Sequence, residues 1–161
     1  MKGRTMSSGS GLHLPPFRLY HAAYVAQDMT RGTQRLAATH GLNHFDFYNG
    51  VEIGVPGGVA IIDVALGHAG SVPIEVIVPC GGVDAVYRNA LPKDDDAVAF
   101  HHFCSRVETD AEWEQVLAIA QSGQFGVPVR GSGYGARGYV YLDTRPVLGH
   151  MLEFLYEEGT P

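Results

Sequence analysis

Short runs of apolar residues, many alternating with polar ones, recur between glycine and proline turns and predict β-strands. In the first half of the chain, the first strand covers residues 17–26. A helix follows over 29–40, with Asp28 or Thr30 as its N-cap and Gly41 as its natural end. Three more strands are predicted at 45–53, 59–66 and 73–78. This half therefore has the predicted element order β-α-β-β-β.

The second half repeats this order. A strand over 98–107 precedes a helix over 111–122, in which Trp113, Val116 and Ile119 fit one apolar face. Further strands are predicted at 127–130, 138–143 and 151–156, with a flexible glycine-rich loop at 131–135. The pattern indicates an α+β fold made of two β-α-β-β-β modules.

Four segments follow from this reading of the chain. We expect a flexible lead-in, a first module, a linker with a short helix and an acidic tip, and a second module. Their ranges are 1–16, 17–80, 81–97 and 98–161.

Composition narrows the classes of partner. The 161 residues carry a net charge of −6 and no cluster of Lys or Arg, which argues against nucleic acid or an anionic membrane as the main partner. No apolar run approaches the roughly 20 residues of a membrane-spanning helix, and the N-terminus lacks a signal-peptide core. Cys80 and Cys104 make no disulfide framework, so we expect two reduced thiols in a cytoplasmic protein.

Histidine and glutamate recur at matching positions in the two modules. The first strand of each module carries a histidine, His21 or His102, and these lie 81 residues apart. The last strand of each carries a glutamate in an apolar frame, Glu75 or Glu153, and these lie 78 residues apart. His101 is adjacent to His102, and spacing alone does not choose between them. Because neighbours in a strand point to opposite faces, at most one of the two is expected in any one pocket.

A glutamate within an apolar strand is costly unless its charge is met. Each of the two glutamates has three ordinary explanations: exposure to solvent, pairing with an arginine, or protonation. The matched histidines favour another explanation, in which two imidazoles and two carboxylates converge on one divalent metal ion per chain. A set of ligands without thiolate suits zinc, nickel, cobalt, manganese or iron.

Several stretches of the sequence resemble the vicinal oxygen chelate superfamily, which includes glyoxalase I, methylmalonyl-CoA epimerase, extradiol dioxygenases and bleomycin-resistance proteins. The stretches are HAAYVAQD at 21–28, VAIIDVALGHAGSVPIEVIVP at 59–79, HFCSRVETDAEWEQV at 102–116 and GYVYLDTRPVLGHMLEFLY at 138–156. The resemblance implies that the two modules pair into a mixed sheet around a cleft. It also implies that His21, Glu75, His102 and Glu153 bind the metal. The adjacent histidines resemble those of methylmalonyl-CoA epimerases, which implies that His102 faces the metal and His101 the other side.

The resemblance further implies a metal-dependent enzyme, an isomerase, epimerase or lyase, that stabilises an enolate or oxyanion of a small oxygen-bearing substrate. Glu153 is the first choice for the base and Glu75 the second. Arg137, Arg145 and Tyr134 are candidates for binding substrate, and a homodimer is expected. A metal-free binding protein of the resistance type and an iron-dependent ring-cleaving dioxygenase remain alternatives. Methylmalonyl-CoA epimerases carry a further glutamate before the third strand, where this chain reads VPGG at 55–58.

Overall fold

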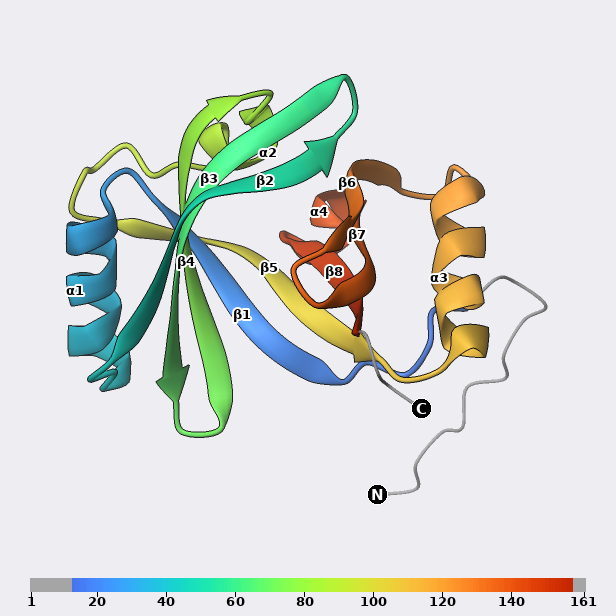
Figure 1. Ribbon diagram of the computed structural model, residues 1–161, viewed down its shortest axis with the longest axis horizontal. Helices are drawn as coiled ribbons and strands as arrows, with labels where there is room; N and C mark the ends of the chain where they lie inside the picture. The colour runs from blue at the N-terminus through green and yellow to red at the C-terminus, as the bar shows by residue number, and fades with distance from the viewer. Residues whose placement is uncertain (1–12, 158–161) are drawn as a thin grey trace.

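The computed structural model describes residues 13–157 and contains one mixed sheet of eight strands (Figure 1). Most of the predicted lead-in, 1–16, lies outside the described residues. The first module consists of β1 (Leu19–Ala26), α1 (Met29–His40), β2 (Phe45–Val55), β3 (Gly58–Ala69) and β4 (Val72–Gly82). The second consists of β5 (Val98–Val107), α3 (Asp110–Gln121), β6 (Gly126–Gly133), β7 (Ala136–Asp143), α4 (Arg145–Leu148) and β8 (Met151–Glu157). The short helix α2 (Ala85–Arg88) lies between the modules.

The strand order is β2-β3-β4-β1-β5-β8-β7-β6. The first strand of each module pairs in parallel with the last strand of the same module, β1 with β4 and β5 with β8. An antiparallel pairing of β1 with β5 joins the modules at the centre of the sheet. Figure 1 shows β1 and β5 running side by side, with β2–β4 on one side of them and β6–β8 on the other. The predicted α+β fold of two paired β-α-β-β-β modules is confirmed.

The two long helices cover one face of the sheet. The Asp28 side chain accepts a hydrogen bond from the Arg31 amide at the start of α1, and Gly41 ends that helix in the left-handed conformation. Buried residues of α1 and the first module form one apolar cluster, and those of α3 and the second module form another. A third cluster, which includes Val25, Ile77 and Tyr139, occupies the opposite face, between the two halves of the sheet.

Glycine at 138 permits close packing between α3 and β7. A Cβ atom at this position would overlap the ring of Trp113, whereas a Cβ at Gly126 would meet only ordinary contacts at 3.6 Å. We therefore expect Gly138→Ala to lower the free energy of unfolding by about 1–3 kcal/mol because the indole must move. Urea denaturation measures this change, with Gly126→Ala as the matched control. An equal effect of both substitutions would contradict the packing argument.

The structure departs from the predicted elements mainly in the second module. The predicted flexible loop at 131–135 is largely strand, because β6 continues to Gly133 and a tight turn at Tyr134 and Gly135 leads into β7. Both turn residues have positive φ angles, 57° and 83°, a combination that suits the twist of a two-residue hairpin. Residues 145–148, between the predicted strands at 138–143 and 151–156, form the short helix α4.

Two other features bear on the sequence-based expectations. Cys80 is exposed, Cys104 is buried, and both are free thiols. Within residues 13–157, no helix has the length and apolar character needed to cross a membrane.

Candidate metal centre

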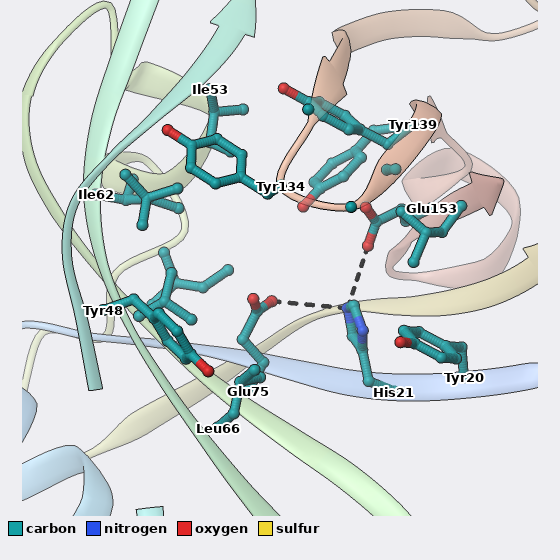
Figure 2. A pocket seen from close by; sticks show the side chains of 18 of the residues that line it. Tyr20, His21, Tyr48, Ile53, Ile62, Leu66, Glu75, Tyr134, Tyr139 and Glu153 are labelled. Carbon is teal, nitrogen blue, oxygen red and sulfur yellow. Dashed lines mark ion pairs between the residues drawn. The ribbon is translucent and has the colours of Figure 1, made fainter. Parts of the chain in front are cut away.

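Strand register brings the four matched residues to the centre of the sheet. On β1 and β4, Ala23 lies opposite Glu75, and on β5 and β8, Cys104 lies opposite Glu153. The pairing of β1 with β5 then sets His21 opposite Cys104. The side chains of His21, Glu75 and Glu153 point toward one another from different strands (Figure 2). The two-module architecture thus gathers residues that lie far apart in the sequence.

Three donor atoms of this quartet, from His21, His102 and Glu153, lie within 3.1–3.3 Å of one another, and Glu75 adjoins the two imidazoles. The Nε2 atoms of His21 and His102 are 3.3 Å apart, and Glu153 Oε2 lies 3.1 Å from each of them. Glu75 Oε2 lies farther away, 3.6 Å from His21 Nε2 and 3.9 Å from His102 Nε2. Two ligands that are each about 2.1 Å from one ion lie roughly 3.0–3.4 Å apart at octahedral or tetrahedral angles. The spacing therefore fits ligands of one small divalent cation, with Glu75 slightly withdrawn.

Glu153 has a buried oxygen without a hydrogen-bond partner among residues 13–157. Two imidazoles lie near this Oε2 atom. Burial by itself would raise the pKa of Glu153, but interactions with His102 and His21 lower it well below its usual range. Burial likewise opposes the charged form of His21, yet Glu153 and Glu75 raise the pKa of this imidazole. A buried carboxylate in this state calls for a cation at the centre of the cluster.

The two adjacent histidines lie on the same side of the sheet, so the prediction that His101 faces the other side is wrong. The register of β1 against β5 jumps from Ala23 opposite His102 to Tyr24 opposite Phe100, which leaves His101 in a β-bulge. The extra residue breaks the alternation on which the prediction depended. His102 is the histidine whose Nε2 joins the cluster, while His101 lies behind it, with 2.8 Å between their Nδ1 atoms.

Hydrogen bonding behind the cluster fixes the tautomer of His102. The Val86 carbonyl lies 3.0 Å from His101 Nε2 and can only accept, so this Nε2 carries the proton. Burial lowers the pKa of His101 to about 3, and the neutral ring therefore accepts at Nδ1. The hydrogen bond between the two Nδ1 atoms then requires His102 to donate. Its Nε2 is left with a lone pair directed at the cluster, which is the form that binds a metal.

A cavity of about 500 Å³ opens beside the quartet on the face of the sheet away from the helices (Figure 2). Its walls are mostly aliphatic and aromatic, with polar atoms concentrated at the carboxylates and phenols. The apolar lining includes Val51, Ile53, Ile62, Val64, Leu66, Ile77 and Leu155, and the tyrosines are Tyr20, Tyr48, Tyr87, Tyr134, Tyr139 and Tyr141. Both the volume and the lining are typical of a small-molecule site.

Strands β2 and β6 approach each other at one end of this cavity. The backbone amide of Glu52 donates a hydrogen bond of 3.1 Å to the Tyr134 hydroxyl. A Cβ at Gly54 would lie 2.9 Å from the Arg130 carbonyl, so the two backbones pass closely there. The two modules therefore meet at the edges of the sheet as well as at its centre, which encloses one end of the cavity.

Only one of the three predicted substrate-binding residues lies at the cavity. Tyr134 is part of its lining, but Arg137 and Arg145 are not. Arg137 lies on the side of α3, where its guanidinium hydrogen-bonds to the Tyr156 hydroxyl at 2.7 Å and pairs with Asp110 at 3.2 Å. Arg145 forms a two-point pair with Asp143. Both arginines were predicted near the site only because they are close in sequence to the last strands. In the structure, their side chains bind partners outside the cavity.

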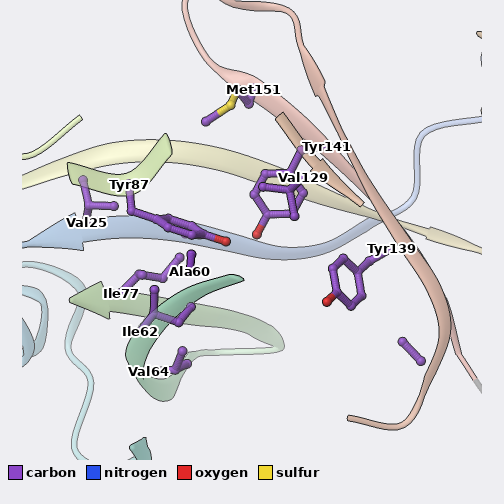
Figure 3. Packing of buried hydrophobic residues seen from close by; sticks show 12 residues of the cluster. Val25, Ala60, Ile62, Val64, Ile77, Tyr87, Val129, Tyr139, Tyr141 and Met151 are labelled. Atoms are coloured by element: carbon purple, nitrogen blue, oxygen red, sulfur yellow. The ribbon is translucent and has the colours of Figure 1, made fainter. Parts of the chain in front are cut away.

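Several residues of the site give little signal in the sequence. Tyr87 comes from the linker helix α2, stacks on His101 with ring centroids 5.2 Å apart, and has a buried hydroxyl without a hydrogen-bond partner among residues 13–157. The Tyr141 ring packs against His102, with ring centroids 4.6 Å apart, and lies edge-on to the Tyr87 ring (Figure 3). Cys104 is buried with Sγ near the donor atoms of His21 and Glu153. The alternation of Tyr139 and Tyr141 along one strand face was the one available clue.

Comparison with known proteins supports the fold. The sequence matches no protein-family model and no curated protein. Among solved structures, methylmalonyl-CoA epimerase from Mycobacterium tuberculosis is similar, with a TM-score of 0.55 and 13% identity over 86% of this chain and 87% of that one. A methylmalonyl-CoA epimerase in complex with methylmalonyl-CoA and ammonium gives a TM-score of 0.57 and 14% identity over 89% and 96% of the two chains. A hypothetical protein from Bacillus halodurans gives 0.55 and 16% over 89% and 96%.

This chain shares the fold of these structures, so the fold implied by the sequence resemblance is confirmed. Several of the structures to which this chain is similar are methylmalonyl-CoA epimerases. A sequence identity of 13–16% supports a shared fold but assigns no particular activity.

Proposed function

We propose that this protein is a metal-dependent enzyme of the glyoxalase and epimerase type, which moves a proton on a carbon next to an oxygen of a small substrate. His21, Glu75, His102 and Glu153 would hold one divalent cation. The observation that carries the proposal is the buried Glu153 oxygen, which has no hydrogen-bond partner among residues 13–157 and lies 3.1 Å from two imidazole nitrogens. Imidazole and carboxylate ligands suit zinc, nickel, cobalt, manganese or iron.

A bound divalent cation would supply Lewis-acid stabilisation of negative charge on the substrate oxygens. The protein's own contribution is to position the substrate in the apolar cavity and to accept and return a proton. When a carboxylate takes the proton from carbon, the C–H electrons move toward the neighbouring carbonyl oxygen. Return of the proton to the opposite face, or to the adjacent carbon, completes an epimerisation or isomerisation.

The geometry favours Glu75 over Glu153 as the base, which reverses the order expected from the sequence. Glu153 lies 3.1 Å from both imidazoles, and its side chain is 8% exposed. Glu75 lies 3.6 and 3.9 Å from the same nitrogens, is 16% exposed and belongs to the cavity lining. The more weakly held carboxylate is freer to reach a substrate proton, whereas the enclosed one is better suited to hold the metal.

Deuterium exchange tests the proposed function directly. Benzoin is a suitable probe because its carbonyl and hydroxyl oxygens are adjacent and the hydrogen between them is readily enolised. In D₂O, the zinc-loaded protein should accelerate loss of this hydrogen's NMR signal, and removal of zinc with a chelator should abolish the acceleration. Binding of benzoin without exchange under any metal would contradict the proposal and favour a binding protein without chemistry.

His101 provides a test of the tautomer argument. We expect His101→Phe to lower zinc affinity by about 10–100-fold, because the ring retains its stacking on Tyr87 while His102 loses the acceptor for Nδ1–H. Competition with a chromogenic chelator measures this affinity. His101→Gln restores an acceptor and should recover part of the loss. Unchanged affinity in His101→Phe would show that His102 needs no such partner.

The resemblance also supports two broader proposals, a homodimer and a cytoplasmic location. Light scattering coupled to size-exclusion chromatography tests the first of these, with a mass near twice the 17.3 kDa chain as the expected result.

A further inference from the structure

The charges around the cavity restrict what it can accept. None of the described residues that line it is a lysine or an arginine, whereas three of them, Glu75, Glu153 and Glu157, are glutamates. Glu157 lies toward the outer end of β8, where it accepts a hydrogen bond of 2.7 Å from Tyr20 and pairs with Arg106 at 2.9 Å. A divalent cation would balance Glu75 and Glu153 and leave no positive charge for an anionic group. A carboxylate or phosphate in this cavity would therefore lie without a counter-charge.

Aromatic rings come from both modules at the open part of the cavity. Tyr48 from β2 and Tyr134 from the turn between β6 and β7 are 50% and 71% exposed, and both are part of the lining (Figure 2). Such rings supply a large, flat contact area for an apolar or aromatic body. The Tyr134 hydroxyl accepts a hydrogen bond from the Glu52 amide, but the exposed faces of both rings pack against no part of the core formed by residues 13–157, which points to a ligand as the partner of those faces.

Tyr134 adds a second, independent observation. It is the only non-glycine residue within 13–157 with a positive φ angle, 57°, a conformation that asparagine or glycine adopts more easily. Strained backbone of this kind is concentrated at functional sites. The hairpin requires a positive φ angle at this position, and a tyrosine fills it at some cost in conformational energy, with its ring at the cavity and its hydroxyl bonded to the Glu52 amide.

We infer that the site takes an uncharged, aromatic or largely apolar molecule with two adjacent oxygens, whose apolar body contacts Tyr48 and Tyr134. This inference rests on the proposed function for the oxygens and on the cavity walls for the rest. It separates this chain from the neighbour whose structure holds methylmalonyl-CoA, because a CoA ester is polyanionic and the lining formed by residues 13–157 provides no lysine or arginine for it.

Three matched probes test the inference by titration calorimetry and ligand-observed NMR, with zinc-loaded and with metal-free protein. Benzoin carries adjacent oxygens and no charge, 4-carboxybenzoin adds one negative charge, and deoxybenzoin lacks one of the two oxygens. We expect benzoin to bind about tenfold or more tightly than 4-carboxybenzoin, since the added carboxylate finds no partner. Zinc should favour benzoin over deoxybenzoin.

Two variants sharpen the test. Tyr48→Arg places a cation at an exposed position of the lining and should reverse the preference toward 4-carboxybenzoin, whereas Tyr48→Phe should keep the wild-type preference. Tyr134→Asn removes both the ring and the hydroxyl that accepts a hydrogen bond from the Glu52 amide, whereas Tyr134→Phe removes only that hydroxyl, so Tyr134→Asn should weaken benzoin binding by about 2–10-fold and Tyr134→Phe should not. An equal loss of benzoin binding in both variants would indicate that Tyr134 acts only through its hydrogen bond to the Glu52 amide.

The outcomes separate the two proposals. Equal or tighter binding of 4-carboxybenzoin by the wild type, or no binding of any probe, overturns the inference about the substrate. If benzoin is preferred over 4-carboxybenzoin but binds like deoxybenzoin with and without zinc, the substrate class stands and metal chelation fails. If zinc favours benzoin over deoxybenzoin while the added carboxylate has no effect, metal chelation stands and the inference about an uncharged substrate fails.

Discussion

Glu75→Gln is expected to slow deuterium exchange of benzoin by about 10²–10⁴-fold at saturating zinc. Glutamine keeps the shape of the side chain and an oxygen that can face the metal, but it cannot accept a proton. Because Glu75 lies at 3.6 and 3.9 Å from the two imidazoles, its exchange for an amide should reduce zinc affinity only modestly. The NMR exchange rate and a chelator competition, measured on the same sample, separate the two effects.

Glu153→Gln is the matched control for this variant. This carboxylate lies 3.1 Å from both imidazole nitrogens and is enclosed, so its neutralisation should abolish zinc binding, and exchange with it. Glu75→Gln is thus expected to lose exchange while it retains zinc, whereas Glu153→Gln is expected to lose both. If Glu75→Gln retains the wild-type exchange rate at full zinc occupancy, Glu75 is not the base, and Glu153 returns as the first candidate.

Zinc is expected to raise the unfolding temperature by about 10 °C at pH 8 when its free concentration is a thousandfold above the Kd at that pH. At the same free zinc concentration, the increase in unfolding temperature should be clearly smaller at pH 5.5. The pKa of His21 in the folded, metal-free protein is raised above 6.5 by Glu153 and Glu75, so its imidazolium stabilises the metal-free fold below pH 6.5. That stabilisation is lost as the pH rises through the folded pKa, while zinc binds better because it needs neutral imidazole.

Titration of Glu153 does not contribute to the difference between the two pH values. Glu153 has a lowered pKa, so its contribution is present above about pH 4.5 and is lost only as the pH falls below that value. It is therefore constant between pH 5.5 and 8. Differential scanning calorimetry at the two pH values measures the effect, with His44→Ala as a control at an exposed histidine. A zinc increment that is equal at both pH values, or larger at pH 5.5, would contradict the assignment of His21 as a ligand.

The parts of the fold that depend on local pattern were predictable. The helix at 29–40 and the strand at 98–107 have the bounds expected from capping residues and apolar runs. The meeting of His21 with His102 also followed from the sequence, because matching positions in two similar modules come together when the modules pair through their first strands.

Features that depend on pairing between distant strands could not be predicted. The bulge at His101 arises from the register of β5 against β1, and no local signal in the stretch AFHHFCSRV announces it. Tyr87 enters the site from the linker, whose position depends on the packing of α2 against the assembled sheet. Arg137 was misplaced because Asp110 and Tyr156, its partners, come from other elements.

The central claim is that four residues from two modules hold one divalent ion, and native mass spectrometry of the zinc-treated protein tests it most directly. The account predicts one zinc ion per wild-type chain and none in His102→Ala, with His44→Ala unchanged. Failure of the wild-type chain to retain zinc or any of the other candidate metals, or equal retention by His102→Ala, would contradict it.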